Sequence, residues 1–140
     1  MAIFYADASA LVKLVREEAE SDALRAYLSA ADLVSSELVL TEIPRAVHRA
    51  VASDPALPLD LLLERSGELL DSVALRPLDR AVLAGAGALG EPVLRALDAI
   101  HVASAIDLYP IEAFVTYDER QAAAARLAGL RTTAPGTGSG

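Results

Sequence analysis

Short apolar segments alternate with amphipathic segments along the whole chain, and this alternation constrains the fold more than any other feature. Residues 2–6, 32–36, 73–77, 112–116 and 130–133 have the length and composition of short strands, the last of them an edge strand. Segments with helical periodicity separate them. Strands that alternate with helices within one domain form a mostly parallel sheet covered by helices on both faces. The sequence therefore predicts an α/β fold around a central sheet of about five short strands.

The amphipathic segments predict helices at about residues 11–18, 24–28, 37–53, 59–70, 79–89, 95–108 and 119–128. Asp118 is placed to cap the last helix and Gly129 to end it. Pro44 interrupts the longest helical segment. Because proline lacks a backbone N–H, it fits the first turn of a helix or else kinks the helix. The sequence leaves both possibilities open.

The length of 140 residues suits a single domain, which we place at residues 1–135, with residues 136–140 as a disordered tail. Hydrophobic residues make up 54% of the chain, which excludes intrinsic disorder. No apolar run is long enough to span a membrane, and Asp7 interrupts the apolar N-terminus, so we expect a cytoplasmic protein with no membrane partner. The absence of cysteine excludes disulfides and thiolate metal sites.

Four acidic residues lie where a solvent-exposed surface explains them poorly. Asp7 and Asp118 each follow an apolar strand, and ligands of an open parallel sheet bind beyond the carboxyl ends of its strands. Glu42 lies within an apolar segment, and Asp98 interrupts the apolar stretch 93–106. Taken singly, each has a simpler explanation, because Asp7 and Asp118 suit helix N-caps, Glu42 a surface position and Asp98 a solvated break in a helix. Their joint placement favours one acidic site.

An acidic site of this kind requires a cation. Two ionised carboxylates about 4 Å apart repel by about 4 kcal/mol at an effective dielectric constant near 20. An all-oxygen set of ligands prefers a hard ion such as Mg²⁺ or Mn²⁺, which supports the hydrolysis of phosphate esters. The net charge of −8 argues against a protein that coats nucleic acid with positive charge, so a polyanionic substrate would depend on such an ion.

Four motifs occur in a familiar order. They are YADASALVKL at residues 5–14, TEIPRA at 41–46, LDAIHVA at 97–103 and VTYDER at 115–120. In order and spacing they resemble the PIN-domain ribonucleases of the VapC toxin type, over nearly the whole chain. The resemblance implies a metal-dependent endoribonuclease in which Asp7, Glu42, Asp98 and Asp118 hold Mg²⁺ or Mn²⁺. Ser9 and Thr116 match the small hydroxyl residues that accompany these acids in the family.

The resemblance also implies partners. Proteins of this type are expected to cut structured RNA such as transfer or ribosomal RNA, to form homodimers, and to be silenced by a VapB-type antitoxin. Basic residues close to the motifs in sequence, Lys13, Arg16, Arg45, Arg49 and Arg120, are candidates for RNA contacts, although each also suits a solvated helix surface.

Other signals favour structural roles. We interpret His101 as a hydrogen-bonded structural residue on the same helix face as Asp98, and His48 as a surface or packing residue. The glycine motif at residues 85–90 has the spacing of a dinucleotide-binding loop, but the residues before it are helical in pattern, so we reject that function. Two alternatives stay open. One is a catalytically silent PIN-like interaction module, and the other is a different α/β protein that handles phosphoryl groups in an acidic pocket.

Overall fold

A five-stranded sheet, parallel throughout, forms the centre of the computed structural model, which describes residues 2–138. The strands are β1 (Ile3–Ala6), β2 (Asp32–Ser36), β3 (Ala74–Arg76), β4 (Ala113–Val115) and β5 (Thr132–Thr133). Their spatial order is β3-β2-β1-β4-β5, so β1 is central and β5 is an edge strand. The predicted fold class is confirmed, including the number of strands.

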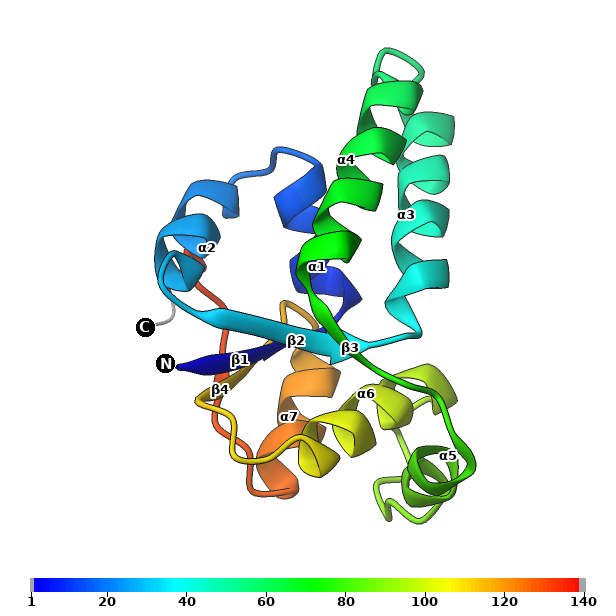
Figure 1. Cartoon of the computed structure of the whole chain (residues 1–140), viewed down its shortest axis with the longest axis vertical. Helices are drawn as coiled ribbons and strands as arrows, with labels where there is room; N and C mark the ends of the chain where they lie inside the picture. The colour runs from blue at the N-terminus through cyan, green and yellow to red at the C-terminus, as the bar shows by residue number, and fades with distance from the viewer. Residues whose placement is uncertain (1, 139–140) are drawn as a thin grey trace.

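Helices cover both faces of this sheet. They are α1 (Ala8–Val15), α2 (Ser21–Leu28), α3 (Val39–Ser53), α4 (Leu59–Ser72), α5 (Arg80–Gly87), α6 (Ala96–Asp107) and α7 (Glu119–Leu127). Figure 1 shows α1 to α4 on one side of the sheet and α5 to α7 on the other. Because every strand is parallel, all strand carboxyl ends lie at the same edge, where the chain enters the next helix.

The side chains of β1 divide the core into two layers. Phe4 and Ala6 belong to the larger apolar cluster, which α1, α3 and α4 complete, whereas Tyr5 packs on the opposite face against α6 and α7. The Tyr5 ring stacks on Phe114 of β4 with 5.0 Å between ring centroids. A central parallel strand is buried on both faces, so a continuous apolar sequence is what β1 requires.

The structure bears on three interpretations of the sequence, of which the place of Pro44 was the open one. Pro44 is the sixth residue of α3 and so lies in its second turn, inside the helix, not in the first turn. The first two glycines of the motif at residues 85–90 lie in α5, which agrees with the rejection of a dinucleotide-binding loop. His48 is exposed, as a surface residue should be.

The end of the chain folds back on the domain as far as it is described. Residues 136–138 continue a turn in which the Thr137 backbone N–H donates to the Ala134 carbonyl at 3.3 Å. The remainder of the predicted tail, residues 139–140, lies outside the described residues. Within residues 2–138, no helix has both the length and the apolar character needed to cross a bilayer.

Candidate active site

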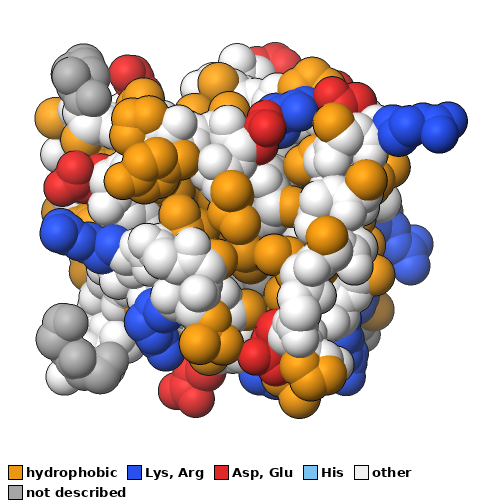
Figure 2. Space-filling model, turned by 90° about the horizontal axis from the view of Figure 1, so that it is seen from below, with side chains coloured by type: hydrophobic (Ala, Val, Ile, Leu, Met, Phe, Trp, Pro, Cys, Tyr) orange, Lys and Arg blue, Asp and Glu red, His pale blue; other side chains and the backbone are white. Residues whose placement is uncertain are grey.

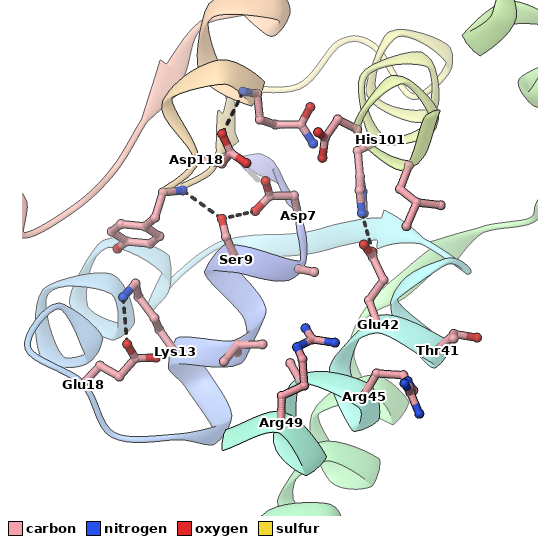
Figure 3. A pocket seen from close by; sticks show the side chains of 17 residues that line it. Asp7, Ser9, Lys13, Glu18, Thr41, Glu42, Arg45, Arg49, His101 and Asp118 are labelled. Atoms are coloured by element: carbon pink, nitrogen blue, oxygen red, sulfur yellow. Dashed lines mark hydrogen bonds and ion pairs between the residues drawn. The ribbon is translucent and has the colours of Figure 1, made fainter. Parts of the chain in front are cut away.

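All four predicted acids line a single cleft beyond the carboxyl ends of the strands. The cleft has a volume of about 630 Å³. Asp7 lies between β1 and α1, Glu42 on α3, Asp98 on α6 and Asp118 between β4 and α7. Figure 3 shows Asp7 and Asp118 on one side of the cleft and Glu42 with His101 on the other. The fold therefore joins residues that are more than a hundred positions apart in sequence.

Asp7 is buried and every one of its carboxylate oxygens has a donor. It is 4% exposed. Its Oδ1 accepts from the Ser9 hydroxyl at 2.6 Å and from the Ala10 backbone N–H at 3.2 Å, and its Oδ2 accepts from the Thr116 hydroxyl at 2.5 Å. Burial raises the pKa of Asp7, and the hydrogen bonds from Ser9 and Thr116 oppose this without reversing it.

Ser9 and Thr116 tie together the two loops that carry Asp7 and Asp118. The Ser9 oxygen accepts from the Tyr117 backbone N–H at 2.9 Å, and the Thr116 oxygen accepts from the Asp118 backbone N–H at 3.1 Å. The two hydroxyl oxygens are 3.3 Å apart. Contacts of this kind suit the orienting role that we expect of both hydroxyls.

Asp7 and Asp118 also cap the helices that follow them. Asp7 caps α1 through Ala10, and the Asp118 Oδ1 accepts from the backbone N–H groups of Arg120 and Gln121 at 2.9 and 3.2 Å. From the sequence, capping a helix and belonging to the acidic site were alternative roles for Asp7 and Asp118. In the structure each carboxylate does both. A cap uses one oxygen of a carboxylate, so the second oxygen of Asp118 is left for the cleft.

Glu42 is held by a hydrogen-bonded chain that begins in the core. The His101 Nε2 lies 2.6 Å from Glu42 Oε1, and its Nδ1 lies 2.8 Å from the hydroxyl of Tyr5, which is fully buried. An ionised carboxylate can only accept, so Nε2–H donates to Glu42, and in a neutral imidazole Nδ1 then accepts from Tyr5. His101 thus fixes the position of Glu42 Oε1 from β1 and α6.

The negative charges of neighbouring acids act on Asp98. It is the third residue of α6 and is partly buried. Burial raises the pKa of Asp98, and the negative charges of Asp118 and Asp7 raise it further. A cleft in which carboxylates destabilise one another's charged forms is one that favours a cation.

The chemistry of these donors fits a hard divalent ion, because all four are carboxylates and the chain has no cysteine. Among residues 2–138, however, no three Asp, Glu, His or Cys side chains are already arranged to hold a metal ion. The negative charges of these carboxylates raise the pKa of Asp98, and a cation among them would offset that repulsion.

Three of the predicted basic residues line the cleft. They are Lys13, Arg45 and Arg49. The Lys13 ammonium is paired with Glu20 at 2.7 Å and with Glu18 at 3.3 Å, and it lies 4.8 Å from the centre of the Tyr117 ring. In Figure 3 the Arg49 side chain extends from α3 toward the cleft, while Arg45 turns away from it. Arg16 and Arg120 are not among the residues that line the cleft.

Sequence reasoning missed two residues of this site. His101 was expected to be structural, and it is buried and hydrogen-bonded, but one of its partners is an acid of the site. Gln121 also lines the cleft and received no attention, although its place three residues after Asp118 was a usable signal.

The chain matches the family model described as "PIN domain" over residues 4–127. It is 37% identical over 140 residues to Ribonuclease VapC47 of Mycobacterium tuberculosis, covering 96% of this chain and 98% of that protein. It is 39% identical over 138 residues to Ribonuclease VapC46 of the same species, covering 96% and 99%.

Solved structures show the same fold at low sequence identity. VapBC2 from Rickettsia felis, bound to a DNA fragment from its promoter, aligns with a TM-score of 0.69 at 14% identity, over 95% of this chain and 98% of that one. Mycobacterium tuberculosis VapC20, a toxin that cleaves the sarcin-ricin loop, aligns with a TM-score of 0.69 at 16% identity, over 94% and 99%. With the acidic cleft and the extent of these matches, the chain belongs to the PIN-domain family and, within it, to the VapC ribonucleases.

Proposed function

We propose that this protein is a Mg²⁺- or Mn²⁺-dependent endoribonuclease, the toxin of a toxin–antitoxin pair, which hydrolyses phosphodiester bonds in transfer or ribosomal RNA. The observation that carries the proposal is the convergence of four acids from distant segments on one cleft, where burial and the neighbouring negative charges raise the pKa of Asp98. The relatives named as VapC ribonucleases support a nuclease, and the likeness to VapC20, which cleaves the sarcin-ricin loop, supports structured RNA as the substrate class.

Each acid has a role that its contacts suggest. Asp7, Asp98 and Asp118 hold the ion, and Glu42 either holds it or orients the attacking water. In that place a bound divalent ion would polarise the phosphate and offset the charge that develops on the leaving oxygen. Ser9 and Thr116 fix both oxygens of Asp7, and His101 fixes one oxygen of Glu42, so neither carboxylate has to be ordered during the reaction.

The basic side chains of α3 suit the RNA backbone. Arg45 and Arg49 both line the cleft, and Arg49, whose side chain extends toward it, is the one placed to contact a phosphate next to the scissile one. Lys13 is already paired with two glutamates, so it contributes less to binding than its place in the cleft indicates.

An antitoxin of the VapB type is the second proposed partner. The structure of Rickettsia felis VapBC2 supports a partner of this class. An antitoxin segment that lies in the cleft and places a basic side chain among the acids would neutralise the charge that the ion otherwise neutralises. Co-expression with the product of an adjacent small reading frame should then abolish cleavage by the wild-type chain.

A second copy of this chain is the third proposed partner. Apolar side chains are exposed on the surface formed by α5, α6 and α7, among them Leu83, Val93, Leu97, Ile106 and Leu127. Figure 2, which views the molecule from the side of these helices, shows exposed hydrophobic side chains with charged groups around them. Exposed apolar surface of this kind is typical of a protein interface. Replacing Leu127, which is 75% exposed, with Lys should lower the dimer fraction in sedimentation.

The nuclease is tested by incubating the purified protein, free of antitoxin, with total RNA. We expect discrete cleavage with Mg²⁺ or Mn²⁺, none with EDTA, and at least a hundredfold lower rate for Asp98→Asn because a ligand of the ion is lost. The matched control is Asp71→Asn, which removes the same charge from an exposed residue of α4 outside the cleft and should cleave at the wild-type rate.

The outcomes separate the alternatives. Absence of cleavage under every condition, with normal dimer formation and antitoxin binding, would make the chain a silent PIN-like interaction module. Equal loss of rate in Asp98→Asn and Asp71→Asn would refute the acidic site. Release of inorganic phosphate from small phosphate esters, with RNA left intact, would favour a different phosphoryl-handling activity.

A further inference from the structure

Gln121 lines the cleft and has a polar atom that no described residue satisfies. The residue is 1% exposed. Within residues 2–138, its Oε1 is the one buried side-chain nitrogen or oxygen that lacks a hydrogen-bond partner. An unpaired buried carbonyl oxygen destabilises a folded protein, so its presence beside a functional cleft calls for an explanation.

Helix capping does not provide that explanation. Gln121 is the third residue of α7, and Asp118 is the N-cap, which is the spacing at which a glutamine side chain accepts from the backbone N–H of the cap residue. In this protein the Asp118 backbone N–H already donates to the Thr116 hydroxyl at 3.1 Å. The hydroxyl that helps to hold Asp7 thus takes the donor that Gln121 would otherwise use.

Core packing does not explain Gln121 either. The buried residues of α7 are Gln121, Ala124 and Ala125, a spacing that defines the core face of the helix. An apolar side chain of similar length would fill the same space without an unpaired oxygen. The carboxamide therefore occupies the one buried position of α7 that lines the cleft.

The chemistry of a carboxamide points to an uncharged ligand group. The amide carries donors and an acceptor but no charge, so it suits a group that can both donate and accept. The Gln121 backbone N–H lies 3.2 Å from Asp118 Oδ1, which places the residue beside the acids. In an RNA strand the polar group nearest a scissile phosphate, apart from the phosphate itself, is the 2′-hydroxyl of the adjoining ribose.

We propose that the Gln121 side chain binds the 2′-hydroxyl of a ribose next to the scissile phosphate and thereby distinguishes RNA from DNA. Turning the carboxamide about its terminal bond exchanges its oxygen and nitrogen, so either atom can face the cleft. The hydroxyl is held, not consumed, and it can donate to the oxygen or accept from the nitrogen. The 2′-hydroxyl is the group by which a protein recognises RNA at a given position. The proposal rests on the proposed nuclease function.

The test combines a substitution of Gln121 with the removal of a 2′-hydroxyl from the RNA substrate. Gln121→Met keeps the length of the side chain and removes both polar atoms. A short RNA that the wild type cleaves is compared with versions that carry a single 2′-deoxy nucleotide on either side of the cut, or at a remote position. We expect one flanking deoxy substitution to lower kcat/KM about five- to tenfold for the wild type, as for one neutral hydrogen bond, and to have no further effect on Gln121→Met.

Two further measurements do not depend on turnover. Anisotropy titration of the same oligonucleotides in the inactive Asp98→Asn background should show the same coupling in affinity. Gln121→Met should raise the melting temperature by about 3 °C or more, since it removes an unpaired buried oxygen. A fall in melting temperature would mean that the amide has a structural partner, and would overturn the proposal.

The outcomes also separate this inference from the nuclease. If the wild type cleaves no RNA, the proposed function fails. If the wild type cleaves RNA but no flanking 2′-deoxy substitution changes kcat/KM or affinity, the function stands and the role of Gln121 is wrong, whether or not Gln121→Met folds. If Gln121→Met and the deoxy substitution have independent effects, Gln121 does not contact the hydroxyl.

Discussion

Replacing Asp7 with Asn should leave the metal-free protein at least as stable as the wild type while removing its response to divalent ions. Asp7 is 4% exposed, and burial raises its pKa, so ionising this carboxyl costs more in the folded protein than in the unfolded chain. Each unit by which the folded pKa exceeds the unfolded value costs about 1.4 kcal/mol above both pKa values. Asn removes that cost.

The hydrogen bonds of Asp7 survive this substitution. The Asn oxygen can accept from the Ser9 hydroxyl and the Ala10 backbone N–H, as Asp7 Oδ1 does. The Asn amide nitrogen then faces Thr116, whose hydroxyl can turn to the Ser9 oxygen 3.3 Å away. Ala at position 7 offers no acceptor, so it loses the helix cap and leaves donors unpaired, at a cost of about 2 kcal/mol or more.

Differential scanning calorimetry or fluorimetry measures the result. For 140 residues, 1 kcal/mol corresponds to about 3 °C in melting temperature. In EDTA we expect Asp7→Asn to melt at or above the melting temperature of the wild type, and Asp7→Ala about 6 °C below it. Mn²⁺ at a hundred times its dissociation constant should stabilise the wild type by about 2.7 kcal/mol, which raises its melting temperature by about 8 °C, and should stabilise Asp7→Asn by less than a third of that.

Two results would refute this reasoning. If Asp7→Asn melts as low as Asp7→Ala in EDTA, the buried negative charge stabilises the fold, and the raised pKa has been misjudged. If Mn²⁺ stabilises Asp7→Asn as much as the wild type, Asp7 does not hold the ion. Asp71→Asn controls for the loss of one negative charge from the whole protein.

Three further predictions concern pH, the support of Glu42 and RNA binding. Because the pKa of Asp7 is raised, its destabilising effect sets in as pH rises above the unfolded value near 4, so the gap in melting temperature between Asp7→Asn and the metal-free wild type should shrink as the pH of calorimetry falls from 7 toward 4. Replacing His101 with Ala should lower kcat about tenfold or more, while Gln, which retains a donor for Glu42, should restore part of it; equal rates for the two variants in a cleavage assay would contradict the role of that hydrogen bond. Arg49→Gln should raise the dissociation constant for RNA and lower the slope of its salt dependence by about one in filter binding, whereas Arg131→Gln, on an exposed residue outside the cleft, should change neither.

The parts of the site that follow strands could be predicted from sequence. An apolar run that ends in Asp is a local pattern, and the parallel sheet brings the two such ends, at Asp7 and Asp118, to one edge because β1 and β4 are neighbours. Glu42 and Asp98 were harder, because a carboxylate within a helix has no local mark of its direction. Their apolar surroundings in sequence marked them as candidates, the resemblance to a family supported them, and in the structure they line the same cleft as the other two.

The remaining features depend on distances between elements, which a sequence does not contain. The His101 bond to Glu42 requires that α6 and α3 approach at the edge of the sheet, across 59 residues of chain. Arg16 and Arg120 are adjacent to acidic motifs in sequence but outside the cleft lining, since a helix turns neighbouring residues to different sides. The oxygen of Gln121 is unpaired because the Asp118 backbone N–H donates to the Thr116 hydroxyl instead. Only the folded structure shows this competition.

The double use of Asp7 and Asp118 has a genetic consequence. Both acids begin a helix as well as line the cleft, so most substitutions at either position that disarm the nuclease also reduce the fraction of folded chain. Asn is the main exception, because it caps a helix as well as Asp does. A selection for loss of toxicity should therefore recover two classes of allele at these codons. In one class many different residues replace Asp and little folded protein accumulates, and in the other Asn replaces Asp and the protein accumulates normally. Only the abundant class would persist as a decoy that still occupies the antitoxin.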